Sequence, residues 1–466
     1  MAAIALRRLP AALLAATALI AVSAQAETRF GEESFTLKNG LQVVVVPNHR
    51  APTVLQFLWY KVGGADEERG KSGSAHFLEH LMFRGTKTVK PKEFSALIAG
   101  VGGEENAFTS WDYTAFYQVV AADQLELVMR LEADRMHNLV ITDDQLKPER
   151  SVVLEEWGMR TGNQPSALLE NQVQAALYFN HPYRIPVLGW KNEIETLDVV
   201  AETRFYDTWY APNNAVLIVA GDVTTDQVRK LADKYYGVIP SKTVPARHRL
   251  DEPDRPGDTR VTLEDQRVRQ PSWSRQFLAP SLRTAGDDRP YALQVLADVL
   301  GGGASSRLHR ALVLDQEIAT GAGAWYEAER YDLGRFLIEV NARPHVTLDK
   351  LGEAADGVID KALHDGIGKD EVERAKKRLI TAALYDQDSL RDPAQIIGRA
   401  LATGQTLEQV DAWPAKIAAV TADQVNAVAR DILRNKPSVT GYLLPAPGAA
   451  AGPVPVEAPP SSGDQR

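Results

Sequence analysis

A nine-residue pattern occurs twice in this chain, 197 positions apart, and it limits the possible folds more than any other feature. Thr224-Thr-Asp-Gln-Val-Arg-Lys-Leu-Ala232 is similar to Thr421-Ala-Asp-Gln-Val-Asn-Ala-Val-Ala429. Each copy predicts the start of a helix, with threonine at the N-cap and an acid in the first turn. Repetition over this distance predicts two similar domains, and 466 residues are enough to give each its own core.

The boundary between the two domains is predicted by composition. The stretch 240–256 is polar and rich in proline, which is typical of a linker. We therefore expect a first domain over 27–240, a linker over 241–260 and a second domain over 261–444. Residues 445–466 are rich in Pro, Ala, Gly and Ser, which predicts a flexible tail.

Within the first domain, apolar periodicity and turn residues predict alternating strands and helices. Asn39-Gly40 is a turn signal inside the apolar segment 35–46, which predicts a hairpin. Further strands are expected at 54–62, 112–120 and 215–220, and helices at 74–84, 91–100, 123–138 and 142–159.

The first 26 residues are predicted to be an export signal. Arg7 and Arg8 precede an apolar run from Leu9 to Val22, and Ala24-Gln25-Ala26 has the pattern of a signal peptidase site. The run is shorter than the ~20 residues that a membrane-spanning helix needs. We expect cleavage after Ala26, no stable membrane anchor, and a mature protein in the periplasm. A mitochondrial presequence is the alternative, disfavoured because the apolar run is continuous rather than amphipathic.

Composition excludes several classes of function. The net charge of −9 argues against a nucleic-acid partner, which would call for a basic face. The chain has no cysteine, so a thiolate metal site, a disulfide scaffold and a cysteine nucleophile are all excluded. Any transition metal must be bound by His, Asp and Glu.

The strongest chemical signal is His76-Phe-Leu-Glu79-His80. On a helix, residues four apart share a face, so both imidazoles can reach one metal ion. Glu79 lies beside them, close enough to contact a water on that ion. This H-x-x-E-H arrangement is the inverse of the commoner H-E-x-x-H zinc peptidase motif.

A catalytic zinc site needs a third protein ligand and an open fourth position. Candidates stand in the acidic segment 149–156. Glu149 and Glu156 are nearly two helical turns apart and share a face, whereas Glu155 points about 100° away from Glu156. The alternative is that this acidic helix simply faces solvent.

The segments 76–80 (H-F-L-E-H) and 149–156 (E-R-x-V-V-x-E-E), separated by a 76-residue spacing from His80 to Glu156, resemble the pitrilysin/insulinase family of zinc metallopeptidases. The resemblance extends over about 34–445. It implies an α+β fold of two similar domains, each a mostly antiparallel sheet packed against helices. It also implies one zinc ion per chain, bound by His76, His80 and Glu156. Glu79 would be the general base and Glu149 a second acid that helps proton transfer or orients a ligand.

The resemblance also implies how a peptide substrate binds. The segment from Asn106 through Ala107 and Phe108 to Thr109 matches the family's edge strand, which pairs with the substrate backbone. An extended peptide added to a sheet edge gains main-chain hydrogen bonds whatever its sequence. From the residues alone, Asn106 could equally be a turn residue.

In one respect the chain departs from the family. Self-sufficient members carry an Arg and a Tyr, seven residues apart, in the second half, and here Val313 and Thr320 occupy those positions. Neither can replace the missing donors. The chain is also about half the length of single-chain members. We therefore expect a zinc endopeptidase that forms a heterodimer with a second subunit of the same fold supplying the Arg/Tyr pair. The alternative is a non-catalytic zinc-binding assembly subunit of that fold.

Overall fold

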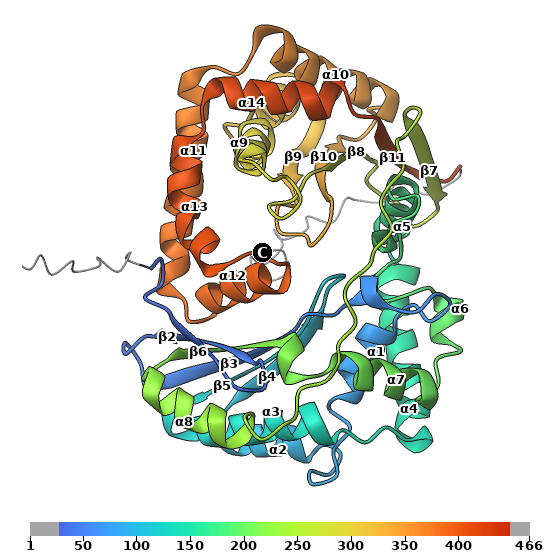
Figure 1. The fold of residues 1–466 in the computed structure, drawn as a ribbon. Helices are drawn as coiled ribbons and strands as arrows, with labels where there is room; N and C mark the ends of the chain where they lie inside the picture. Colours follow the sequence, from blue (N-terminus) through green and yellow to red (C-terminus); the bar gives the residue numbers. More distant parts are fainter. Residues whose placement is uncertain (1–27, 448–466) are drawn as a thin grey trace, which may run out of the picture.

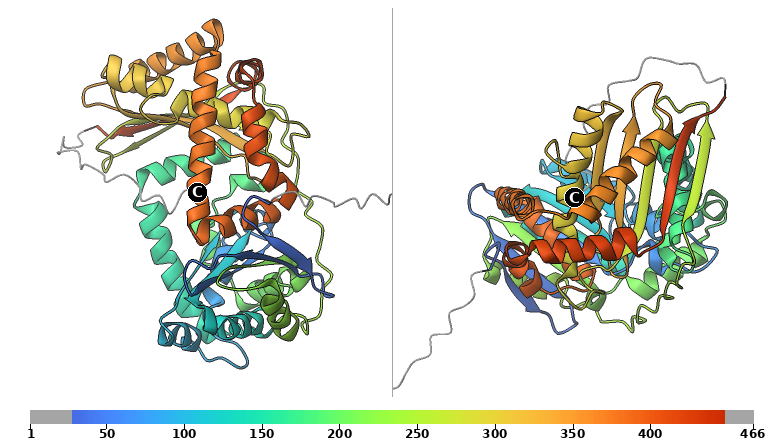
Figure 2. Two further views of the ribbon diagram at one scale, coloured as in Figure 1. Left: turned by 90° about the vertical axis from the view of Figure 1, so that its left-hand side faces the viewer. Right: turned by 90° about the horizontal axis from the view of Figure 1, so that it is seen from above.

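The fold is described by a computed structural model that places residues 28–447, in two layers, one above the other (Figure 1). The expected signal segment, residues 1–26, and nearly all of the tail expected over 445–466 lie outside the described residues. The left view of Figure 2 separates the layers, with blue and cyan strands below the yellow-to-red ones. Among the described residues, no helix has the length and apolar character needed to span a membrane.

The first layer is a six-stranded sheet in the order β1-β2-β6-β3-β5-β4. Its strands are β1 (Glu33–Thr36), β2 (Gln42–Pro47), β3 (Thr53–Tyr60), β4 (Glu104–Thr109), β5 (Thr114–Ala121) and β6 (Ala215–Gly221). Only β2 and β6 run parallel, so the sheet is mostly antiparallel. The predicted hairpin forms between β1 and β2, and the other predicted strands all lie within one or two residues of their expected limits.

The second layer is a five-stranded sheet in the order β7-β11-β8-β10-β9. Its strands are β7 (Thr259–Asp265), β8 (Ser272–Ala279), β9 (Ala319–Tyr326), β10 (Gly334–Ala342) and β11 (Ser438–Pro445). Only β7 and β11 run parallel. Apart from β1, the two sheets therefore have the same strand order and the same directions, as expected for a duplicated domain.

The repeated sequence pattern, however, does not mark equivalent helices. Thr224 begins α8 (Thr225–Tyr235), which follows strand β6, whereas Thr421 begins α14 (Ala422–Ala429), which precedes the equivalent strand β11. The topological counterpart of α14 is α7 (Val199–Trp209), directly before β6. The prediction of two similar domains is confirmed, but the pairing of α8 with α14 is wrong.

The remaining helices follow the same duplicated plan. The first half contains α1 (Ser74–Leu81), α2 (Glu93–Gly100), α3 (Leu125–Asn138), α4 (Asp143–Trp157), α5 (Pro165–Leu177) and α6 (Lys191–Ile194). The second half contains α9 (Arg289–Gly301), α10 (Leu348–Asp365), α11 (Lys369–Tyr385), α12 (Arg391–Ala402) and α13 (Leu407–Ala419).

One face of each sheet is covered by a helix from the other half of the chain. Helix α12 of the second half packs on the first sheet, where Ile397 joins a core with Phe57 and Trp59. A Cβ at Gly398 would lie 2.1 Å from Trp59, so only glycine permits this approach. Conversely, α5 of the first half covers β7 and β11 of the second sheet. The packing therefore crosses the expected domain boundary in both directions.

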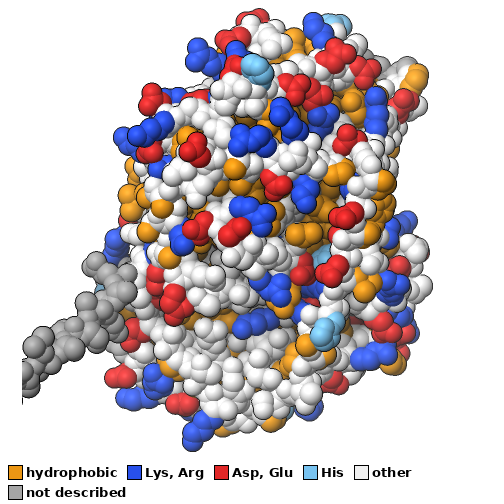
Figure 3. Space-filling model, turned by 45° about the horizontal axis from the view of Figure 1, so that its top comes forward, with side chains coloured by type: hydrophobic (Ala, Val, Ile, Leu, Met, Phe, Trp, Pro, Cys, Tyr) orange, Lys and Arg blue, Asp and Glu red, His pale blue; other side chains and the backbone are white. Residues whose placement is uncertain are grey.

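Charged side chains of both signs are interspersed over the face seen in Figure 3. On this face, neither sign of charge gathers in one large patch.

Candidate metal centre

Helix α1, which carries the H-x-x-E-H segment, begins at an acid from the preceding loop. Glu67 accepts the backbone N–H groups of Gly73 at 3.0 Å and Ala75 at 2.8 Å. These bonds satisfy donors that a helix N-terminus leaves unpaired, and they oppose the rise in the pKa of Glu67 that its burial causes. Buried Phe77 and Leu78 fix the opposite side of the helix in the core of the first domain. The motif is therefore held on a well-anchored element.

Three side chains converge on one face of this helix. His76 and His80 lie on one face of α1, with ring centroids 4.8 Å apart. The Nε2 atoms of His76 and His80 lie 3.5 Å and 3.2 Å from the same Oε2 atom of Glu156, which projects from α4. The candidate ligand atoms all lie within 4.8 Å of one another, and no other group of this kind occurs over residues 28–447. Glu155 is exposed on another face of α4, as the helical spacing predicts.

The donor set fits zinc. Two imidazole nitrogens and one carboxylate oxygen are the ligands of a common catalytic zinc site. Zinc bonds of about 2.0–2.2 Å would separate tetrahedral ligands by roughly 3.3–3.6 Å, close to the spacing seen here. Burial, and then the neighbouring His80, lower the pKa of His76 to about 4, so its ring is neutral and able to bind a cation.

Glu79, between the two histidines in sequence, meets the edge of the first sheet. The Thr109 hydroxyl on β4 donates a hydrogen bond to Glu79 Oε2 at 2.5 Å. Burial raises the pKa of Glu79 to about 7, although the bond from Thr109 opposes that shift. A carboxyl group with a pKa near neutrality can both accept and return a proton.

Glu149 lies behind His80, on the side away from Glu156. Its Oε1 accepts a hydrogen bond from His80 Nδ1 at 2.9 Å, and its side chain is only 3 % exposed. The other oxygen forms an ion pair with Arg84, which follows α1 in the chain. Of the two roles expected for Glu149, orienting a ligand matches this arrangement, because the bond fixes the ring so that Nε2 faces Glu156.

The expected substrate strand is β4, the outer strand of the first sheet. Among the described residues, no strand pairs with its free side. Ala107 and Thr109 face α1 and the core beneath it, whereas Phe108 packs on the other face against Trp59. Asn106 is exposed, and its side chain accepts the backbone N–H of Ala107. The strand thus offers a free edge directly beside Glu79.

The two positions where the resemblance leads one to expect Arg and Tyr lie in the second half. Val313 packs against the second core from a π-helical turn, His309–Asp315. Thr320 is exposed at the start of β9 and donates a hydrogen bond to the backbone oxygen of Asn341. Neither contacts the cluster around His76.

Sequence reasoning missed three residues that support this centre: Glu67, Arg84 and Thr109 in its contact with Glu79. Glu67 and Arg84 flank the motif closely, so an acid before the helix and a base after it were available signals. The contact between Thr109 and Glu79 depends on how β4 docks against α1, which local sequence does not reveal.

Comparison with known families gives two adjoining matches. The family model described as "Insulinase (Peptidase family M16)" matches residues 42–191, and "Peptidase M16 inactive domain" matches 203–379. The first match lies within the first half of the fold, whereas the second runs from α7 of the first half to α11 of the second.

Individual relatives match over most of their length. Zinc protease PqqE of Helicobacter pylori is 29 % identical over 89 % of this chain and 93 % of its own. A zinc protease of Streptomyces coelicolor is 30 % identical over 87 % of this chain and 88 % of its own.

Solved structures agree with these matches. A protease from H. pylori superimposes with a TM-score of 0.83 at 28 % identity, covering 89 % of this chain and 99 % of that one. The periplasmic protease PqqL of Escherichia coli superimposes with a TM-score of 0.75 at 19 % identity. The superposition covers 91 % of this chain and 49 % of PqqL. At that identity, the likeness to PqqL concerns the fold.

Proposed function

Because the chain belongs to the insulinase family of peptidases, family M16, we propose that it is a zinc-dependent endopeptidase that hydrolyses peptides or unfolded segments. The observation that carries the proposal is the convergence of His76, His80 and Glu156 beside the buried carboxyl group of Glu79. A protein that only bound zinc would have no use for a buried carboxyl group beside the ligands.

In the proposed mechanism, His76, His80 and Glu156 bind the zinc ion. Zinc supplies Lewis-acid chemistry: it makes a water molecule more acidic and polarises a carbonyl group. Glu149 holds the His80 ring by accepting a hydrogen bond from its Nδ1, and Arg84 keeps Glu149 charged and in place. These two residues orient a ligand and do not contact the substrate.

Glu79 moves the proton. Its carboxylate takes a proton from the attacking water and returns it to the amine that leaves when the peptide bond breaks. The hydroxyl of Thr109 holds one oxygen of Glu79, at 2.5 Å, which fixes the direction in which the other oxygen faces. General-base catalysis of this kind contributes typically ~10²–10⁴ in rate.

The free edge of β4 would bind the substrate backbone. A peptide paired with residues 104–109 would lie extended alongside the base, held by main-chain hydrogen bonds that place few demands on its sequence. Asn106, Ala107, Phe108 and Thr109 would contribute this edge. The scissile bond would then lie near Glu79 and the three ligands.

The experiment that tests the proposal is a peptidase assay with metal removal and return. The protein is purified with any partner that accompanies it and incubated with an unstructured peptide such as casein. We expect cleavage to stop after treatment with a chelator and to return with one equivalent of zinc per chain. Activity that survives complete removal of zinc would contradict the proposal.

We also propose that the active form is a heterodimer. Val313 and Thr320 stand where the family has the Arg and Tyr that bind substrate and oxyanion, and donors at an oxyanion typically contribute ~10²–10³ in rate. A second subunit of the same fold would supply that pair. The pure chain should bind zinc but cleave casein poorly, and its co-purifying partner should raise turnover by at least ~10²-fold. Full activity of the chain alone would exclude this arrangement.

The alternative function is that of a non-catalytic, zinc-binding assembly subunit. It predicts stoichiometric zinc without cleavage of any peptide, either alone or with the partner. Export to the periplasm, with cleavage after Ala26, and domain limits of 27–240 and 261–444 remain proposals. N-terminal sequencing of the protein from its host tests the first, and limited proteolysis within 241–260 tests the second.

A further inference from the structure

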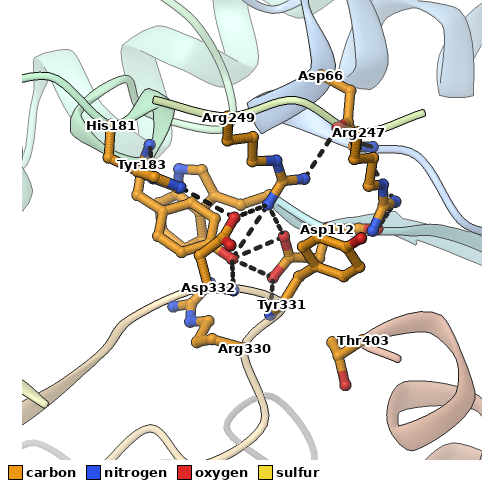
Figure 4. Close-up of polar contacts among 12 residues, drawn as sticks. Asp66, Asp112, His181, Tyr183, Arg247, Arg249, Arg330, Tyr331, Asp332 and Thr403 are labelled. Atoms are coloured by element: carbon orange, nitrogen blue, oxygen red, sulfur yellow. Dashed lines mark hydrogen bonds and ion pairs between the residues drawn. The ribbon is translucent and has the colours of Figure 1, made fainter. Parts of the chain in front are cut away.

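Two arginines of the segment between the domains are buried, although that segment was expected to be a simple linker. The side chains of Arg247 and Arg249 are 7 % and 4 % exposed. Figure 4 shows both pointing into a polar cluster to which each half of the chain contributes. Burying a charged side chain is costly unless it is paired, so the partners of these arginines indicate what the segment does.

Arg249 binds two carboxylates of the first domain at once. Its Nη2 lies 2.9 Å from Asp66 Oδ1, and its Nη1 lies 2.5 Å from Asp112 Oδ1. The same Nη1 lies 3.2 Å from Asp332 Oδ2 of the second domain and 3.2 Å from the Tyr183 hydroxyl. The planar guanidinium thus joins four residues from different segments. It reinforces the backbone hydrogen bonds that Gly64 and Ala65 donate to Ser110 and Trp111, next to Asp66 and Asp112.

Arg247 makes a second bridge between two of the same residues. Its Nη2 lies 3.4 Å from Asp66 Oδ2 and also donates to the backbone oxygen of Asp112. Its guanidinium lies 4.8 Å from the ring centroid of Tyr331. Asp66 and Asp112 are therefore held together by two arginines that belong to neither of their elements.

Each of these aspartates is close in sequence to a residue that supports the proposed catalytic centre. Asp66 is adjacent to Glu67, whose carboxylate binds the first turn of α1. Asp112 lies in the turn that joins β4 to β5, three residues after Thr109, which binds Glu79. The arginine bridge consequently connects the start of the zinc-site helix to the end of the expected substrate strand.

The charges in this cluster support a rigid connection. Burial alone would raise the pKa of Asp112, but the facing guanidinium of Arg249, together with Arg330 and Arg247, holds it below its ordinary value. The Asp112 carboxylate also accepts the Tyr183 hydroxyl at 2.7 Å and the backbone N–H of Tyr331 at 3.1 Å. With so many fixed partners, Asp112 has little freedom to move.

We propose that Arg247 and Arg249 are positioning residues for peptide hydrolysis: their bridge from Asp66 to Asp112 sets the separation between Glu79 on α1 and the peptide-binding edge of β4. This inference rests on the proposed function. If β4 shifted, a peptide paired with it would shift too, whereas Glu79, His76 and His80 on α1 would stay in place. Loss of the bridge would therefore misplace the scissile bond while leaving both zinc binding and peptide binding largely intact.

The test is Arg249→Lys in the complete protein, with its partner if it has one. Lysine keeps the charge that the buried aspartates require, but a single ammonium cannot span Asp66 and Asp112 as a guanidinium does. We expect kcat per bound zinc for casein cleavage to fall at least ~10-fold, since a misplacement of about 1 Å can cost up to ~10² in rate. KM should change less than about threefold, because substrate is bound by β4 itself. Arg247→Lys should also lower kcat per zinc while leaving KM nearly unchanged, but its kcat should fall less than that of Arg249→Lys.

Arg283→Lys is the matched control. Arg283 belongs to the same cluster, lying 3.6 Å from Asp332 and 2.7 Å from the backbone oxygen of Tyr331, but it contacts neither Asp66 nor Asp112. Its kcat per zinc should equal that of the wild type. The inference is overturned if Arg249→Lys keeps wild-type kcat per zinc, or if Arg283→Lys loses as much. If Arg249→Lys fails to fold, Arg247→Lys decides between these outcomes.

Hydrogen exchange separates failure of this inference from failure of the proposed function. In Arg249→Lys, we expect faster deuterium uptake at 104–109 and 73–80 than in the wild type, with uptake in the second sheet unchanged. This result does not depend on any activity. An inactive wild type would refute the peptidase proposal. Unchanged deuterium uptake at 104–109 and 73–80 in Arg249→Lys would instead refute the positioning role of the arginines.

Discussion

Helices α1 and α9 occupy the same step of the duplicated fold, since they follow the equivalent strands β3 and β8, yet they bury very different side chains. Helix α1 buries His76 next to Glu79, whereas the buried positions of α9 are apolar or aromatic throughout, from Tyr291 to Leu300. Helix α4, with Glu149 and Glu156, also differs from its counterpart α11, which buries Val372, Ala375 and one charged residue, Lys376. Among the described residues, the second copy has no group of His and acidic side chains like the one formed by His76, His80 and Glu156.

This difference shows how a duplicated fold can tolerate a costly site. Buried titratable groups destabilise a domain unless they are paired. The second copy supports the first through α12, which covers the outer face of the first sheet. It also contributes Asp332 to the arginine cluster. The half that holds the candidate metal ligands is therefore packed against, and stabilised by, the other half.

The largest expected effect comes from Glu79→Gln, which removes the base from the copy that holds the candidate metal ligands. Glutamine keeps the size but cannot accept the proton, so kcat should fall ~10²–10⁴-fold while zinc content stays near one per chain. Glu155→Gln is the matched control on the exposed face of α4 and should change kcat less than about twofold. Equal losses in both variants would place the base elsewhere.

The support given by the second half is tested by Ile397→Ala in α12. Deleting this buried side chain should lower the free energy of unfolding by about 2–5 kcal/mol, measured by urea denaturation. Hydrogen exchange should quicken in β3 and β6 of the first sheet, although the substitution lies in the second half. Val238→Ala, at a 75 % exposed position, should cost nearly nothing. Loss of protection only in the second sheet would contradict support across the boundary.

A smaller effect is expected from Glu149→Gln. If Glu149 orients His80, the zinc dissociation constant should rise ~10–100-fold, measured by competition with a chromogenic chelator. Glu155→Gln should leave the zinc dissociation constant unchanged. Unchanged affinity with a collapse of kcat would instead assign Glu149 to proton transfer.

The smallest effect concerns Glu202, a buried acid on α7. Both of its oxygens are buried, and the nearby Ser74 side chain only partly opposes the effect of that burial on its pKa. Burial raises its pKa from 4.5 to about 8. Between those values the unfolded chain loses this proton while the folded one keeps it. The free energy of unfolding should therefore fall with rising pH, by up to about 1.4 kcal/mol per unit.

Glu202→Gln removes this dependence. Its melting temperature should exceed that of the wild type by a margin that grows from pH 5 to pH 8. Glu195→Gln, at a half-exposed position on the same side of the fold, should show no growing margin. If the melting temperatures of Glu202→Gln and the wild type changed in parallel with pH, Glu202 would not be the cause of lower stability at higher pH.

Local pattern was enough to predict much of this molecule. His76, Glu79 and His80 lie on one short helix, and the spacing along α4 placed Glu149 and Glu156 on one face, whereas only the family resemblance proposed Glu156 as the ligand. The duplicated domain was also predicted, but from the wrong pair of helices. A threonine cap with glutamine three residues later also begins α4 and α13, so it marks the start of a helix rather than a repeat.

What sequence could not reveal depends on distant parts of the chain. Arg249 and Asp112 are 137 positions apart, and the polar, Pro-rich composition around Arg249 is that of an exposed linker. Only the folded arrangement shows that this segment is packed between both halves. The crossing of α5 and α12 onto the opposite sheets is likewise invisible locally, since an amphipathic helix does not specify which sheet it covers.

The central claim is that one copy of the fold holds a single catalytic zinc ion and the other copy holds none. Diffraction from crystals of the zinc-loaded protein, collected at the zinc absorption edge, tests it most directly. We expect one anomalous peak per chain, bonded to Nε2 of His76, Nε2 of His80 and a carboxylate oxygen of Glu156, each at about 2.0–2.2 Å. A peak at any other place, or no peak at full zinc loading, would contradict the account.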